Sequence, residues 1–132
     1  MFGEENTISI LHVDDEPGFS ETAAAFLERE NDRFDIRTET SPSDGLDWLA
    51  DHPVDCIVSD YDMPRQNGIE FLTDVRERDD RLPFILYTGK GSEEIASQAI
   101  AAGVTGYLQK ETGTGQYAVL ANRITNAVAQ YR

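Results

Sequence analysis

Acidic residues that directly follow short apolar runs are the side chains of this chain best suited to chemistry. Asp60 comes two residues after the end of the run 56–58, and Asp14 and Asp15 come directly after the run 8–13. A carboxylate at the end of a buried strand is costly to place unless a cation or hydrogen bonds compensate for its charge. Asp60 is therefore the candidate reactive group, although an isolated aspartate in such a place more often caps the following loop.

Two further apolar runs end in a hydroxyl and an amine. Thr88 follows the run 83–87, and Lys110 follows the run 106–109. Crowded carboxylates repel one another unless a cation lies among them, and hard oxygen ligands with room for water suit Mg²⁺. With that ion present, Asp60 could act as a nucleophile towards a phosphoryl group, whose oxygens the hydroxyl and the ammonium would bind.

These residues can act together only if the elements that precede them lie side by side. The apolar patterns predict strands that alternate with amphipathic helices. The predicted strands are 8–13, 34–38, 56–58, 83–87 and 106–109, and the predicted helices are 17–30, 42–52, 69–78, 92–103 and 116–131. Such alternation is typical of a parallel sheet that is joined by right-handed crossovers and covered by helices on both faces.

The predicted architecture is an α/β fold, the flavodoxin-like doubly wound (βα)5 arrangement with a five-stranded parallel sheet of order 2-1-3-4-5. In that order the first and third strands are neighbours, and the fourth and fifth lie beyond the third. All of the candidate side chains then meet at one edge of the sheet. No linker or low-complexity run divides the chain, so we expect one domain over residues 1–132.

The composition narrows the classes of partner. The chain has 25 acidic and 11 basic residues and a formal net charge of −14, so direct binding to nucleic acid or anionic membranes is not expected. The lone Cys56 excludes an internal disulfide framework, and no apolar segment approaches membrane-spanning length. A cytoplasmic location is therefore predicted. The acid-rich, lysine-poor balance also resembles that of halophilic proteins from salt-accumulating organisms.

Taken together, these motifs resemble the response-regulator receiver domain of two-component signalling over essentially the whole chain. The matching pieces share one property, their position at or near the carboxyl end of a predicted strand. They are Asp14-Asp15, Asp60 in Asp-Tyr-Asp-Met-Pro, Gly68, Thr88-Gly89, and Gly106-Tyr107 leading to Lys110.

The resemblance implies that Asp60 is the phosphoacceptor in a phosphorelay and takes its phosphoryl group from a sensor histidine kinase or a small acyl phosphate. It implies that Mg²⁺ is held by Asp15, Asp60 and the backbone carbonyl of Asp62, with Asp14 assisting through water. Thr88 and Lys110 would bind the phosphoryl oxygens. Such a domain assists its own phosphorylation and dephosphorylation and is not a turnover enzyme.

The resemblance also implies a switch. Thr88 and Tyr107 match the pair that moves when phosphate arrives, and the surface made by 92–103, 106–109 and 116–131 would then control a downstream protein or output domain. Asp62 and Lys90 would flank the approach of the hydrolytic water. Their opposite charges suggest a pair that lengthens the life of the phosphate.

One residue departs from the family pattern, which usually has proline after the active-site lysine, often with a cis peptide. Here Glu111 follows Lys110. A cis bond to a non-proline residue costs about 3 kcal/mol, so we expect a trans peptide and an altered loop.

The main alternative is a haloacid-dehalogenase-type phosphatase, in which Asp60 and Asp62 would form the Asp-x-Asp nucleophile and acid. That class needs a later lysine followed by an acidic pair, which is absent after Lys110, and it leaves Asp14-Asp15 without a role. A nucleotide-binding switch lacks its glycine motif. A pseudo-receiver that only binds proteins would not need the complete set of acids, threonine and lysine.

Overall fold

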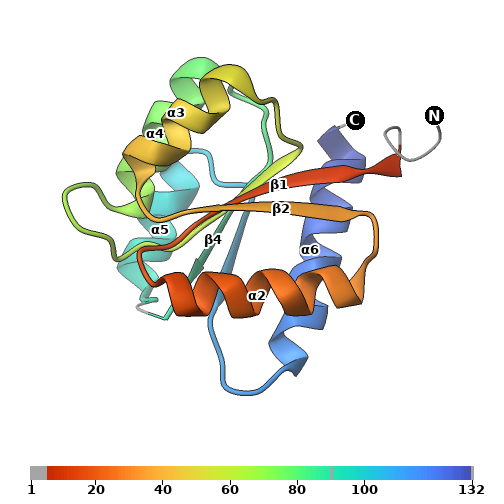
Figure 1. The fold of residues 1–132 in the computed structure, drawn as a ribbon. Coiled ribbons are helices and arrows are strands. Elements are labelled where there is room, and N and C mark those ends of the chain that lie inside the picture. Colours follow the sequence, from red (N-terminus) through yellow and green to blue (C-terminus); the bar gives the residue numbers. More distant parts are fainter. Residues whose placement is uncertain (1–5, 90, 132) are drawn as a thin grey trace.

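A parallel sheet of five strands forms the centre of the computed structural model, which describes residues 6–89 and 91–131 (Figure 1). The strands are β1 (Ile8–Val13), β2 (Phe34–Glu39), β3 (Cys56–Ser59), β4 (Phe84–Thr88) and β5 (Gly106–Gln109). The helices are α2 (Pro17–Glu30), α3 (Pro42–Asp51), α4 (Gly68–Arg78), α5 (Glu93–Ala101) and α6 (Gly115–Tyr131). The predicted elements are confirmed, with ends that shift by one or two residues, as helix and strand ends commonly do.

The strand order is β2-β1-β3-β4-β5, as predicted. All neighbouring strands pair in parallel, with Val13 opposite Ser59 where β1 meets β3 and Thr88 opposite Gln109 where β4 meets β5. The residues that follow these four strands therefore leave the sheet at the same edge. This carboxyl edge is where open α/β sheets bind ligands.

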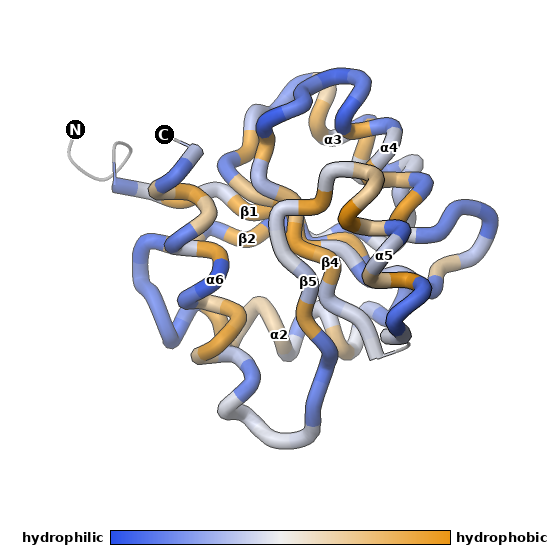
Figure 2. The backbone as a smooth tube through the Cα atoms, turned by 180° about the vertical axis from the view of Figure 1, so that it is seen from behind, coloured by the Kyte–Doolittle hydropathy of each residue, from blue (hydrophilic) through white to orange (hydrophobic). Residues whose placement is uncertain are grey.

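Helices cover both faces of the sheet. Figure 1 shows α2 and α6 on one side and α3, α4 and α5 on the other. Each layer has its own buried apolar cluster, and Figure 2 shows how hydrophobic residues gather in the strands and alternate with hydrophilic ones along the helices. Among the described residues, no helix is both long enough and apolar enough to cross a membrane.

The helices begin where the sequence supplies capping groups. The Ser41 side chain accepts a hydrogen bond from the Asp44 amide at the start of α3, as its N-cap position predicted. Asn67 and Glu70 form a reciprocal capping box at the start of α4. These caps fix where the chain turns away from the carboxyl edge after β2 and β3.

Candidate functional site

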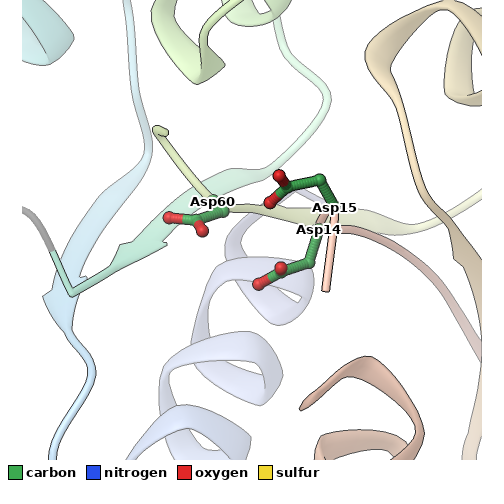
Figure 3. Close-up of side chains that lie close together, drawn as sticks. All are labelled: Asp14, Asp15 and Asp60. Atoms are coloured by element: carbon green, nitrogen blue, oxygen red, sulfur yellow. The ribbon is translucent and has the colours of Figure 1, made fainter. Parts of the chain in front are cut away.

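Three carboxylates meet at the carboxyl edge, where β1 and β3 lie side by side. Each of Asp14, Asp15 and Asp60 offers one oxygen, and these oxygens all lie within 4.8 Å of one another (Figure 3). Asp14 is fully buried and Asp60 is 6% exposed. Buried carboxylates at such spacing repel one another strongly unless a cation lies among them. The predicted acidic cluster is therefore formed by the fold.

The backbone holds two of these carboxylates in place. The Glu16 amide donates to Asp14 Oδ1 over 2.9 Å, which closes the turn between β1 and α2. The Tyr61 amide donates to Asp60 Oδ1 over 2.7 Å. The second oxygen of each group, Oδ2, is left to face other partners at the edge of the sheet.

Lys110 supplies the positive charge at the site. Its Nζ lies 2.7 Å from Asp14 Oδ2 and 3.2 Å from Asp60 Oδ2. Burial alone would lower the pKa of Lys110, but the hydrogen bond and charge of Asp14, together with Asp60, outweigh burial and raise it. Lys110 is therefore a fixed ammonium that bridges the two most buried acids.

Asp15 has a different environment from its neighbour. Burial, followed by the negative charge of Asp14, raises the pKa of Asp15 above its ordinary value. After burial, the neighbouring carboxylates of Asp14, Asp60 and Asp62 add to this rise. A divalent cation would offset these negative charges, and three carboxylate oxygens are the hard donors that Mg²⁺ prefers.

A cavity of about 460 Å³ opens over these groups. It is lined by Asp15, Glu16, Asp60, Asp62, Gly89 and Lys110. The cavity brings Asp62, whose side chain is exposed, to the same opening as Asp60. Lys90, proposed from the sequence to pair with Asp62, lies outside the described residues. Thr88 is buried at the end of β4.

Gly68 is required by the close approach of α4 to the loop that carries Asp60. A Cβ atom at this position would lie 2.2 Å from the Asp60 carbonyl oxygen and 2.8 Å from a methyl of Leu86. The Gly68 amide also donates to the Tyr61 carbonyl over 2.8 Å. Any larger residue would push the Asp60 loop away from β1, so the glycine keeps the carboxylates together.

The predicted switch residues lie on one face of the sheet. Leu86 pairs with Tyr107 and Thr88 pairs with Gln109, so the side chains of Thr88 and Tyr107 point to the same side as diagonal neighbours. The Tyr107 hydroxyl is buried, and among the described residues it has no hydrogen-bond partner. A buried hydroxyl without a partner is costly, so this position of the ring leaves one polar group unsatisfied.

Two side chains at this edge were given only structural roles from the sequence. Phe19 was predicted only as part of a buried helical stripe, but its ring lies 4.1 Å from Lys110 Nζ, measured to the ring centroid. His12 is buried on β1, and neither ring nitrogen has a hydrogen-bond partner among the described residues. Burial lowers the pKa of His12 to about 4, partly offset by the charge of Asp14. Its position two residues before Asp14 was the only available signal.

The peptide between Lys110 and Glu111 is trans, as predicted, because no cis peptide occurs among the described residues. The Lys110 amide donates to the Thr88 carbonyl over 2.9 Å, which extends the pairing of β4 and β5 as far as the lysine. The lysine is thus anchored to the sheet at its own backbone.

Comparison with known families decides which chemistry this arrangement belongs to. The family model described as "Response regulator receiver domain" matches residues 10–121. The chain belongs to the response regulator receiver domain family. Domains of this family serve two-component signalling and are phosphorylated on an aspartate; they are signalling domains and not classical turnover enzymes. The membership decides against the haloacid-dehalogenase-type phosphatase.

Curated relatives agree with this assignment. Response regulator Rre1 of Synechocystis sp. is 35% identical over 105 residues, which are 78% of this chain and 45% of that protein. The phosphoglycerate transport system transcriptional regulatory protein PgtA of Salmonella typhimurium is 32% identical over 124 residues, 94% of this chain and 29% of that protein. The chain thus spans less than half the length of these relatives.

Solved structures confirm the fold. A response regulator receiver domain protein from Clostridium thermocellum superposes with a TM-score of 0.82 at 25% identity, covering 93% of this chain and 95% of that one. A CheY-like receiver domain protein from Methanospirillum hungatei gives 0.84 at 21% identity, covering 95% and 96%. None of these relatives supports the expectation of a salt-adapted origin.

Proposed function

We propose that Asp60 is the residue that accepts the phosphoryl group in a phosphorelay. The observation that carries the proposal is the meeting of three carboxylates and the Lys110 ammonium at one edge of the sheet. Asp60 is the acid that lies between the other two carboxylates and the strand ends that carry Thr88 and Lys110. Its carboxylate also lines the cavity, so a donor can reach it.

The transfer is a substitution at phosphorus. An oxygen of the Asp60 carboxylate forms a bond to phosphorus, while the bond from phosphorus to the donor breaks and the donor keeps that electron pair. With a phosphohistidine donor the broken bond is P–N, and with a small acyl phosphate it is P–O. The product is a mixed anhydride on Asp60. The Lys110 ammonium and the Thr88 hydroxyl bind the equatorial oxygens as the phosphoryl group arrives.

Mg²⁺ is the cofactor that fits these acids. We propose that Asp14, Asp15, Asp60 and the backbone carbonyl of Asp62 form its site, in part through water. The crowding of acids around Asp15 supports this, because the charges of Asp14, Asp60 and Asp62 add to the effect of burial in raising its pKa. When bound, the ion neutralises the acids so that an anionic phosphoryl group can approach. The same arrangement would assist both phosphorylation and loss of the phosphate.

The response to phosphorylation is proposed to run through Thr88 and Tyr107. Movement of the Thr88 hydroxyl towards the phosphate would open space on the face that it shares with Tyr107. The Tyr107 hydroxyl, which has no hydrogen-bond partner in the described part of the chain, supports a ring with two available positions. The readout surface would be α5, β5 and α6, and the population of its two arrangements would shift.

A sensor histidine kinase is the proposed donor, and a downstream protein or output domain is the proposed target. The relatives named above are a response regulator and a transcriptional regulatory protein, both longer than this chain. We also propose that residues 1–132 form a single receiver domain in the cytoplasm. No direct contact with nucleic acid or membrane is proposed for it.

Intact-mass measurement after incubation with acetyl phosphate tests the proposal. Wild-type protein with Mg²⁺ should gain the mass of one phosphoryl group, and a chelator should prevent the gain. Asp60→Asn should gain nothing, because its amide is not a nucleophile of this kind. Asp74→Asn, at a half-buried position of α4 outside the lining of the cavity, is a matched control that should be labelled like wild type. Labelling of Asp60→Asn at the wild-type rate would refute the proposal.

A further inference from the structure

The Gln116 side chain uses its full hydrogen-bonding capacity on the loop that follows Lys110. Its Oε1 accepts from the Glu111 amide over 3.0 Å and from the Tyr87 hydroxyl. Its Nε2 donates to the carbonyls of Glu111, over 2.6 Å, and Gly113, over 2.8 Å. A carboxamide has two donors and two acceptor sites, so all four are occupied. Gln116 therefore binds the loop 110–114 from both sides of its backbone.

Two features of the loop make this arrangement possible. Glu111 has an amide hydrogen to donate, which a proline in that position would lack. Gly113 has a positive φ of 86°, which a residue with a Cβ atom rarely adopts, and this turn presents its carbonyl to Gln116. The loop is thus held by a side chain from α6.

Tyr87 connects the Gln116 amide to the buried side of the active site. The Tyr87 side chain is 1% exposed, and burial raises its pKa, so the hydroxyl keeps the proton that it donates to Gln116. The centroid of its ring lies 6.0 Å from that of Phe19. The Phe19 ring in turn lies under the ammonium of Lys110. A contiguous set of contacts therefore runs from the loop amide to the lysine head group.

Lys110 is the residue most affected by this loop. Its backbone is fixed on the β5 side by the hydrogen bond to the Thr88 carbonyl, and on the other side it is followed at once by Glu111. A shift of the Glu111 peptide would move the Lys110 Cα and pull its Nζ away from Asp14 and Asp60. The carboxylates would stay in place, because Asp14 and Asp60 directly follow β1 and β3 and are held by the Glu16 and Tyr61 amides.

We propose that Gln116 is a positioning residue for Lys110: its carboxamide holds the loop 110–114 in the conformation that keeps the lysine ammonium between Asp14 and Asp60. The consequence for function rests on the proposed role of Lys110 in phosphoryl transfer. The structural part, the immobilisation of the lysine, can be measured independently of phosphorylation.

Lysine-labelled NMR provides the first test, because Lys90 and Lys110 are the only lysines of the chain. In ¹³C-lysine protein, Lys90→Arg assigns the two side-chain signals, and relaxation of the Cε methylene reports motion of the Lys110 head group. Gln116→Met keeps the length of the side chain and removes all four hydrogen bonds. We expect Lys110 to become mobile in Gln116→Met. Gln130→Met, at the exposed far end of α6, is the matched control and should leave the signal unchanged.

Phosphorylation rates provide the second test. Gln116→Met should slow labelling by acetyl phosphate about 10-fold, since a misplaced catalytic group costs up to about 100-fold. The Mg²⁺ dissociation constant should stay at its wild-type value. In a Lys110→Ala background the same change should have no further effect, because the two residues act as one unit. If Gln116 acted independently of Lys110, the losses of labelling rate caused by the two substitutions would multiply in the double variant.

Gln116→Glu keeps the acceptor oxygen but loses both donors to the loop, and it carries the test if Gln116→Met does not fold. A Lys110 side chain as rigid as wild type in a folded Gln116 variant would overturn the inference, as would rate effects that multiply. Failure of wild-type protein to be phosphorylated would refute the proposed function, while the NMR result would still decide the role of Gln116.

Discussion

The two ends of the strands shift the pKa of an aspartate in opposite directions. At the amino edge, Asp79 accepts the Arg81 amide over 2.9 Å, the Leu82 amide over 3.1 Å and the Tyr131 hydroxyl over 3.0 Å. The Arg81 hydrogen bond, with those of Tyr131 and Leu82, lowers the pKa of Asp79 despite some burial. At the carboxyl edge, burial and Asp14 raise the pKa of Asp15.

This contrast separates aspartates that stabilise the fold from aspartates that belong to the candidate site. The charge of Asp79 is satisfied by the chain itself, because loop and helix ends supply the donors. Asp14 and Asp60 each accept one backbone amide and share the Lys110 ammonium, and Asp15 and Asp60 line a cavity. Ionisable groups with shifted pKa values that line a cavity are typical of a functional site.

Removing the cation at each edge should give the largest difference. Lys110→Ala should slow phosphorylation by acetyl phosphate at least about 100-fold, the usual cost of losing one group that stabilises developing charge. Arg76 is the matching cation at the amino edge, where it donates to the Gly103 and Leu82 carbonyls. Arg76→Ala should lower the melting temperature and leave the labelling rate of the folded protein unchanged. Equal losses of labelling rate in Lys110→Ala and Arg76→Ala would contradict the difference between the two edges.

Magnesium should stabilise the protein through the carboxyl edge alone. At 100 times its dissociation constant, a ligand of the folded state adds about 2.7 kcal/mol to the free energy of unfolding. Urea melts with and without Mg²⁺ should show this gain in wild type and in Asp79→Asn. Asp15→Asn should lose most of it. A gain that is the same in all three proteins would show that the ion binds elsewhere.

The pH dependence of stability should carry a signature of His12. Its folded pKa of about 4 lies below the ordinary value of 6.5, so the unfolded state binds the proton first as pH falls. Stability is therefore complete above about pH 6.5 and is lost down to about pH 4, by about 2 kcal/mol at pH 5. The difference between wild type and His12→Leu in urea melts at pH 7.5 and pH 5 measures this term. A difference that does not change with pH would contradict it.

The smallest effect is expected from removing the Tyr131 hydroxyl, which donates to Asp79 at the amino edge. Tyr131→Phe removes one hydrogen bond to Asp79 and should cost about 1 kcal/mol of unfolding free energy. Denaturant melts would measure the loss, and phosphorylation should proceed at the wild-type rate. A slower phosphorylation in this variant would mean that the two edges are coupled through α6.

The sequence was sufficient to predict the site residues whose positions depend on where the strands end. Apolar runs locate the strands, and once the strand order is known the positions of Asp14, Asp60 and Lys110 follow from it. Ends were shifted by a residue, as at β3, where Ser59 still pairs with Val13. Such shifts depend on pairing across the sheet, which a single run of residues does not contain.

The contacts that no pattern predicted are those between side chains of distant elements. Examples are Phe19 against Lys110, the Gln116 carboxamide on the loop, and the His12 ring nitrogens, which have no hydrogen-bond partner among the described residues. All of these depend on rotamers and on how α2 and α6 pack against the sheet. Apolar periodicity locates a helix face but not the partner of each side chain. These residues therefore became visible only in the structure.

The central claim is that Asp60, among several neighbouring acids, carries the phosphoryl group. The most direct measurement is peptide mapping of the acyl phosphate after labelling with acetyl phosphate and Mg²⁺, with hydroxylamine used to confirm the mixed anhydride. The account predicts that the modified, hydroxylamine-sensitive residue is Asp60 and no other. Modification of Asp14, Asp15 or Asp62 in the wild-type protein would contradict it.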